Sequence, residues 1–158
     1  MEQIWAPWRI EYIQRAREQG CFLCQKPKEN NDEANFILYR GQRNFMMLNA
    51  FPYNPGHVMV APYQHVANLQ NLTDDEAKEH FIIIKKSIDL LTEVLKPAGF
   101  NIGLNLGRVA GAGIEGHLHT HIVPRWEGDV NFMPVLSDTR VLSEALADTY
   151  RKLKARLT

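Results

Sequence analysis

Three histidines alternate with other residues in the stretch His117-Leu118-His119-Thr120-His121-Ile122-Val123. Alternation with a period of two predicts a β-strand, because successive side chains of a strand point to opposite faces. His117, His119 and His121 should then line one face, with neighbouring rings about 6 to 7 Å apart. Three titratable rings on one face carry a high desolvation cost, which favours a functional site over a purely structural role.

The chemistry of such a run fits attack on phosphorus. A neutral histidine has a free basic ring nitrogen near pH 7 and needs no separate base. A neighbouring imidazolium can stabilise developing negative charge or protonate the leaving oxygen. Because His-x-His on a strand also binds zinc, the spacing alone leaves a metal site open.

The segment before the run, residues 107–116, contains four glycines. Glycine permits a backbone concavity whose amides face an anion, although a merely flexible connection is the alternative for the loop taken alone. A glycine-rich loop that enters a histidine strand fits phosphate better than a metal cage. The two features together therefore favour a phosphate site.

The rest of the chain predicts an α+β fold. Thr73 and Glu76 form a capping-box pattern at the start of a central helix, which Pro97 and Gly99 end. Apolar residues at helical spacing predict that this helix covers one sheet face; they are Phe81, Ile84, Ile88, Leu91 and Leu95. Short apolar runs predict the strands of an antiparallel sheet; they are residues 36–39, 45–48, 57–60, 101–106 and 117–123.

The two ends of the chain and the connections are less regular. Residues 26–33 are polar and read as a loop, and Trp5 and Trp8 belong to an apolar N-terminal arm. An amphipathic C-terminal helix is expected to begin near Ser137. It presents Leu142, Ala145, Leu146, Tyr150, Leu153 and Leu157.

Length and charge limit the function classes. The 158 residues suit one domain, and 18 basic against 18 acidic residues give a formal net charge of zero. We therefore expect neither nucleic acid nor a membrane surface as partner. The sequence shows neither a signal-peptide pattern nor an apolar run long enough to span a bilayer, so we expect a cytoplasmic protein.

The histidine run resembles the signature of the histidine-triad (HIT) family, and residues 48–65, LNAFPYNPGHVMVAPYQH, resemble the nucleotide-side strands of that family. The resemblance covers most of residues 20–126. It implies one HIT-like domain over residues 1–158, with a core of about 20–126, an antiparallel sheet, one central helix, an N-terminal arm and a C-terminal helix. It also implies a homodimer that binds purine nucleotides.

The resemblance also implies roles for single residues. It makes His119 the nucleophile, and His121 a hydrogen-bonding partner to the phosphate. Asn49 matches the position that contacts the ribose hydroxyls, and Asn105 the one that supports the phosphate. His57 belongs to the same pattern, either as support for the site or as a structural residue. The phosphate-binding set is completed by the loop residues Gly111, Ala112 and Gly113.

Two departures from the family pattern matter. Thr120 stands at an apolar position of the signature, which a strand tolerates because threonine has good β propensity. The Gly-Gln-Ser/Thr element that commonly precedes the triad is replaced by Ala112-Gly113-Ile114. The form of residues 110–132 resembles the branch that includes diadenosine tetraphosphate phosphorylases, in which inorganic phosphate rather than water accepts the nucleotidyl group.

Cys21 and Cys24 suggest a metal or redox pair in a reducing compartment. The resemblance adds His65 and His117 as the remaining ligands of a structural Zn²⁺ site. Such a closed Cys2His2 site has no open coordination position, so catalysis would not need it. Free thiols or a lost site are the alternatives, and no organic cofactor is expected.

The sequence thus predicts a nucleotidyl transferase or hydrolase that acts on dinucleoside polyphosphates through a covalent intermediate on His119. A nucleoside phosphoramidate hydrolase, a zinc hydrolase with the triad as ligands, and a nucleotide-binding protein with negligible turnover are the alternatives. His80 is expected near solvent and is assigned no function. Arg125 and Trp126 either contact base or phosphate or pack at a strand end.

Overall fold

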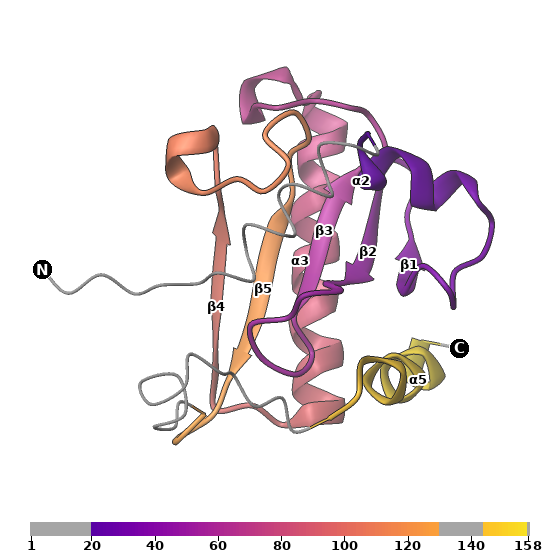
Figure 1. Ribbon diagram of the computed structural model, residues 1–158, viewed down its shortest axis with the longest axis vertical. Coiled ribbons are helices and arrows are strands. Elements are labelled where there is room, and N and C mark those ends of the chain that lie inside the picture. Colours follow the sequence, from indigo (N-terminus) through magenta and orange to yellow (C-terminus); the bar gives the residue numbers. More distant parts are fainter. Residues whose placement is uncertain (1–19, 130–143, 158) are drawn as a thin grey trace, which may run out of the picture.

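The computed structural model describes residues 20–129 and 144–157. Five strands form one antiparallel sheet in the order β1-β2-β3-β5-β4 (Figure 1). The predicted α+β class and antiparallel sheet are confirmed. The strands are β1 (Ile37–Arg40), β2 (Asn44–Leu48), β3 (Val58–Pro62), β4 (Gly99–Leu104) and β5 (Thr120–Arg125).

One long helix, α3 (Asp74–Leu95), crosses one face of the sheet, as predicted (Figure 1). It begins with the expected capping box, in which Thr73 accepts from the Glu76 amide and Glu76 accepts from the Thr73 amide. The helix ends at Leu95 and is capped by Lys96, which has a left-handed conformation and precedes Pro97. The other helical elements are α2 (Phe22–Gln25), η1 (Lys26–Lys28), η2 (Leu69–Asn71), η3 (Arg108–Ala110) and α5 (Leu146–Leu157).

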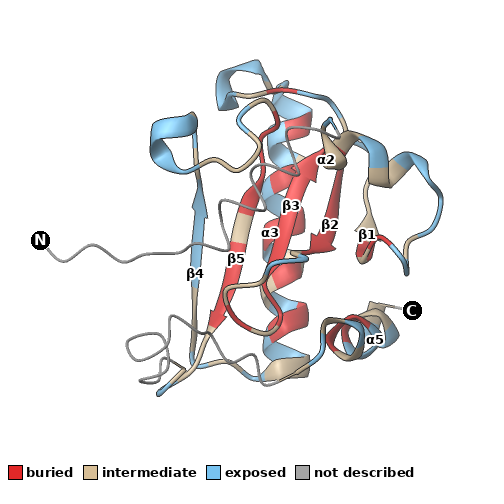
Figure 2. Cartoon of the chain, viewed as in Figure 1, coloured by how far each residue is buried: buried red, intermediate tan, exposed pale blue. Residues whose placement is uncertain are grey.

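The sheet buries both faces over its central strands, and every residue of β2 and β3 is buried (Figure 2). On one face, α3 and α5 pack on a core that contains Leu48, Val58 and Ile122. On the other face, Leu23 of α2 packs against a second cluster that includes Met59. β4 is different, because the side chains of most of its residues are exposed at the edge of the sheet.

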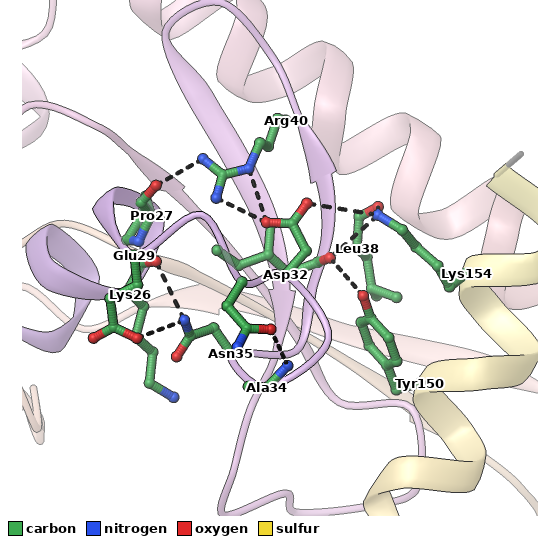
Figure 3. Close-up of polar contacts among 12 residues, drawn as sticks. Lys26, Pro27, Glu29, Asp32, Ala34, Asn35, Leu38, Arg40, Tyr150 and Lys154 are labelled. Carbon is green, nitrogen blue, oxygen red and sulfur yellow. Dashed lines mark hydrogen bonds and ion pairs between the residues drawn. The ribbon is translucent and has the colours of Figure 1, made fainter.

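α5 covers the opposite edge of the sheet (Figure 3). The Tyr150 hydroxyl donates to the Ile37 carbonyl at 3.2 Å, and Lys154 Nζ donates to the Leu38 carbonyl at 2.9 Å. Asp32 lies between Arg40 and Lys154 and forms an ion pair with each. These contacts use carbonyls of β1 that a further strand would otherwise pair with, so α5 blocks edge-to-edge association there.

Three sequence predictions need correction. The segment 26–33 is not all loop, because it begins with η1, and η3 interrupts the glycine-rich loop. The C-terminal helix begins at Leu146, because Glu144 and Ala145 are not helical. Its predicted start near Ser137, and the N-terminal arm with Trp5 and Trp8, lie outside the described residues.

The third correction concerns the histidine run, which is strand only from Thr120 onward. In a continued ladder with β3, the residue opposite Leu118 would be Pro62, which has no N–H to donate. The Leu118 amide donates instead to the carbonyl of Val66 at 2.6 Å. Among the described residues, no helix is long and apolar enough to cross a membrane.

Candidate functional site

His121 lies on β5 and faces away from α3, beside His57, which immediately precedes β3. The Tyr53 amide donates to His57 Nδ1 at 3.1 Å, so that nitrogen is an acceptor and the His57 proton is on Nε2. His57 Nε2 then donates to His121 Nδ1 at 2.9 Å. This direction leaves the proton of a neutral His121 on Nε2, where it can be donated to an anion.

His119 is held by its other ring nitrogen. Its Nδ1 donates to the carbonyl of His117 at 2.8 Å, so Nε2 of the neutral ring carries the lone pair. The residue is 8% exposed, and burial lowers its pKa, with the bond to the His117 carbonyl acting in the opposite direction. His119 therefore has the protonation state of a nucleophile at neutral pH.

The three histidines do not form the single row that alternation predicts. The His119 and His121 rings lie 4.8 Å apart, edge to face, which is closer than strand spacing alone gives. His117 precedes the strand and turns its Nδ1 toward Cys21 and Cys24 instead. The run is thus divided between two sites.

The second site contains four possible metal ligands. Ligand atoms of Cys21, Cys24, His65 and His117 all lie within 4.8 Å of one another. Nitrogen–sulfur distances are 3.2 to 3.3 Å, and the two histidine Nδ1 atoms are 3.3 Å apart. A tetrahedral zinc ion with bonds of about 2.0 to 2.3 Å separates its ligands by about 3.3 to 3.8 Å, so the group fits such an ion.

His117 has the tautomer that a metal ligand requires. Its Nε2 donates to the Pro62 carbonyl at 2.8 Å, which leaves the lone pair on Nδ1, the atom that faces the cysteines. Burial lowers the pKa of His117 to about 4 and raises that of Cys21 to about 11. Because His117 faces this group, the geometry does not support a zinc centre built from the triad itself.

The glycine-rich loop uses some of its own amides. Gly107 and Gly111 have left-handed φ angles of 79° and 89°, which glycine adopts without strain. The Gly111 amide donates to the Arg108 carbonyl at 3.0 Å, and the Ala112 amide to Gly107 at 3.4 Å. Asn105 Nδ2 donates to the Gly111 carbonyl at 3.4 Å, so the structure brings these two residues together.

Asn49 follows β2 and is half-buried. Its Oδ1 accepts from the Phe51 amide at 2.9 Å, and its Nδ2 lies 3.5 Å from His57 Nδ1. The structure therefore brings Asn49 next to the His57–His121 pair, on the β2 side of it.

A buried link between α3 and the histidine run was missed by the sequence analysis. His80 is 5% exposed rather than near solvent, while Phe81, assigned to the buried stripe, is 66% exposed. The Asn44 carboxamide donates to Glu76 and Glu79, so its Oδ1 accepts from His80 Nδ1 at 2.8 Å. His80 Nε2 is then an acceptor.

The hydroxyl of Thr120 donates to His80 Nε2 at 2.7 Å. Burial lowers the pKa of His80 to about 4, which keeps the ring in the neutral form that this pattern needs. Thr120, the departure from the apolar signature, is thus matched by a polar partner on α3. His80 precedes the buried Ile84 and Leu91 by four and eleven residues, and this helical spacing was the sequence signal that could have predicted its burial.

Arg125 closes the other end of β5. Its Nε and Nη2 donate to Asp129 at 2.6 and 2.9 Å, and its Nη1 donates to Asn101 at 2.6 Å. The guanidinium lowers the pKa of Asp129, which also accepts from Asn54 and from the Trp126 amide. Arg125 is therefore fixed in place at the end of the strand.

A cavity of about 580 Å³ lies along β4 and β5 between His121 and Arg125. It is lined by Tyr53, Asn54, Asn101, Ile102, Gly103, Asn105, Ala110, His121, Val123 and Arg125. Its size is typical of a small-molecule site. The geometry thus combines a histidine whose Nε2 carries the lone pair, a neighbouring histidine whose Nε2 carries a proton, and an adjoining polar cavity.

Comparison with known proteins agrees with this geometry. The HIT domain matches residues 30–128. The chain belongs to the HIT domain family. An AP-4-A phosphorylase of Mycobacterium tuberculosis (strain H37Rv) is 38% identical to it over 97% of this chain and 83% of its own length.

Other relatives are more distant. The asymmetrical bis(5'-nucleosyl)-tetraphosphatase of Schizosaccharomyces pombe is 33% identical, over 59% of this HIT chain and 50% of its own. Among solved structures, a Zn-bound histidine triad family protein from Mycobacterium smegmatis has a TM-score of 0.70 and 24% identity over 87% of this chain and 93% of its own. The C. elegans NitFhit protein has a TM-score of 0.63 and 30% identity, over 77% of this chain and 27% of its own.

Proposed function

We propose that the protein is a nucleotidyl transferase that acts on dinucleoside polyphosphates, with His119 as the covalent carrier. The observation that carries the proposal is the bond from His119 Nδ1 to the His117 carbonyl, which leaves the Nε2 lone pair for attack. The relative named AP-4-A phosphorylase supports diadenosine tetraphosphate as substrate. It also supports inorganic phosphate as acceptor.

The first chemical step is an in-line displacement. The His119 Nε2 lone pair forms a bond to the α-phosphorus, and the bond from phosphorus to the bridging oxygen breaks. The leaving nucleotide takes that electron pair on its oxygen. His121 Nε2–H, oriented by His57, donates to a phosphate oxygen as negative charge develops.

The second step releases the nucleotidyl group. A phosphate oxygen attacks the same phosphorus, the phosphorus–nitrogen bond breaks, and its electron pair returns to His119 Nε2. We assign Asn49, which lies 3.5 Å from His57, to the ribose. We assign Asn105, which lines the cavity beside His121, and the loop residues Gly111, Ala112 and Gly113 to the phosphate. Phosphoramidate hydrolysis and binding without turnover remain the alternatives for the same site.

Product analysis tests this function. Purified protein is incubated with diadenosine tetraphosphate, with and without inorganic phosphate, beside His119→Ala. We expect ADP and ATP only when phosphate is present, and no product from the variant. AMP and ATP regardless of phosphate would establish a hydrolase. No turnover would favour phosphoramidate hydrolysis or binding without turnover.

We propose that Cys21, Cys24, His65 and His117 hold a structural zinc ion. The four ligand atoms lie within 4.8 Å of one another, four of the distances between them are 3.2 to 3.3 Å, and the Nδ1 atoms of both histidines face the cysteines. When bound, the ion would stabilise the fold and supply no open position for substrate. His117 would thereby tie the metal site to the carbonyl that orients His119.

We also propose a homodimer formed through β4, with the chain as one domain. Ile102 and Leu104 are 46% and 36% exposed on the α3 side of this edge strand. Among the described strands β4 pairs only with β5, and a strand edge with apolar side chains is a common interface. Sedimentation should show a dimer that Ile102→Glu dissociates. The cysteine thiols favour a reducing, cytoplasmic location.

A further inference from the structure

Apart from His121 and Asn105, the residues that line the cavity beside His121 have no role in the reaction as described so far. We propose that it holds the leaving nucleotide of the dinucleoside polyphosphate, the part of the substrate beyond the bridging oxygen. The inference rests on the proposed function and adds a second nucleotide subsite to it.

The position of the cavity fits this role. Asn49, assigned to the ribose of the transferred half, follows β2, whereas the cavity floor is formed by β5 and β4. The strand order β2-β3-β5-β4 therefore places the two on opposite sides of the His57–His121 pair. An in-line displacement requires the nucleophile and the leaving group on opposite sides of the phosphorus, so the departing half needs space of its own.

The lining of the cavity offers several polar groups to a nucleotide. Arg125 lies at the far end, where Asp129 balances its charge and Asp129 and Asn101 hold its guanidinium in place. The carboxamides of Asn101 and Asn105 and the ring of Tyr53 add polar and aromatic surface. A volume of about 580 Å³ accommodates a ligand of nucleotide size.

The same cavity would admit the acceptor. The second displacement occurs opposite the His119–phosphorus bond, which is the side from which the first leaving group departed. Inorganic phosphate therefore enters by the inner end of the cavity, close to His121, after the leaving nucleotide has gone.

Gly103 offers a way to fill the cavity without disturbing the fold. It pairs with His121 across β4 and β5 and contributes to the floor. A Cβ added at this glycine would meet no atom within 4 Å, and its φ is not left-handed. Gly99 is equally open, lies on the same face of the same strand and does not line the cavity, so Gly99→Leu is a matched control for Gly103→Leu.

The test compares two substrates that share the adenylyl half, diadenosine tetraphosphate and adenosine 5'-phosphoramidate, whose leaving group is only ammonia. We expect Gly103→Leu to lower the ratio of their kcat/KM values by about tenfold or more, which corresponds to about 1.4 kcal/mol of lost binding to the larger leaving group. Gly99→Leu should change that ratio by less than about twofold.

The proposal would be overturned if Gly103→Leu left the ratio of the two kcat/KM values unchanged. It would also be overturned if the variant lost more kcat/KM with the phosphoramidate than with the tetraphosphate. If the wild-type protein reacts only with diadenosine tetraphosphate, the KM for this substrate is compared instead. An unchanged KM in Gly103→Leu then overturns the proposal. If Gly103→Leu does not fold, the exposed Asn101→Ala carries the same comparison. Wild-type protein that transfers from neither substrate would instead contradict the proposed function itself.

Discussion

At the scale of single residues, the site depends on which ring nitrogen carries each proton. A backbone amide makes His57 Nδ1 an acceptor, and a backbone carbonyl makes His119 Nδ1 a donor. These two bonds fix opposite tasks for the neighbouring rings, with a lone pair on His119 Nε2 and a proton on His121 Nε2. Local backbone groups thus decide roles that identical side chains could exchange.

His57 can be tested by replacing it with residues that keep or lose its donor. Glutamine can place an amide donor near the position of Nε2, whereas leucine cannot. We expect His57→Leu to lower kcat about tenfold, because one hydrogen bond of about 1 to 1.5 kcal/mol orients His121, with KM changed less than about twofold.

His57→Gln should retain kcat within about threefold of wild type, since it still donates to His121. Steady-state kinetics of both variants, after thermal unfolding has shown that they are folded, makes the comparison. Equal losses in the two variants would contradict the role of His57 as a donor and leave it a packing residue.

At the scale of elements, periodicity predicted the strands and α3 but not how they meet. The strands β1, β2, β3 and β4 lie within two residues of their predicted places, because alternation and turn residues are local signals, whereas β5 begins three residues late. The phase of α3 was wrong at its start, where buried His80 takes the place expected for Phe81. Hydrophobicity alone cannot rank a polar residue as buried when its partners, Asn44 and Thr120, lie far away in sequence.

The candidate site, too, was predictable only where local sequence signals determine it. Alternation predicted that His119 and His121 lie side by side, although their rings are 4.8 Å apart, closer than strand spacing gives. The departure of His117 does not, because it depends on Pro62 ending the ladder from the neighbouring strand. The cavity was not predictable either, since the register of β4 on β5 brings Asn101 and Gly103 to it.

His80 gives the junction of α3 and β5 a pH dependence. Its pKa is about 4 in the folded protein against an ordinary value of 6.5, so between these values the unfolded chain binds more protons. Stability should therefore be full above pH 6.5 and fall as the pH drops toward 4, by roughly 3 kcal/mol from this residue. Asn44 joins His80 to the Glu76 backbone carbonyl and to the Glu79 carboxylate.

The measurement is the free energy of unfolding of wild type and His80→Gln by denaturant at several pH values from 7 to 4. The variant should be less stable at pH 7 and should lose less stability on acidification. Parallel curves for the two proteins would show that His80 titrates normally and that burial does not hold it neutral.

At the scale of the whole molecule, the metal group joins segments that are distant in sequence. Cys21 and Cys24 come from the start of the described chain, His65 follows β3, and His117 precedes β5. Zinc there would close long loops and hold α2 on the sheet, which predicts a large effect on folding.

Removal of zinc should therefore lower the stability of the fold and should not directly stop the reaction. We expect about one zinc ion per chain and a loss of several kcal/mol of unfolding free energy in Cys24→Ser or after chelation. Metal analysis and calorimetry measure both. An immediate loss of activity on chelation, with unfolding unchanged, would contradict a structural role and favour a zinc hydrolase.

The central claim is the covalent intermediate on His119, and intact-mass spectrometry tests it most directly. Protein is mixed with diadenosine tetraphosphate without phosphate and quenched in alkali, which preserves a phosphorus–nitrogen bond. We predict a mass increase of one adenylyl group that inorganic phosphate removes and that His119→Ala lacks. Turnover of the substrate by wild type with no adduct, or an equal adduct on the variant, would contradict the account.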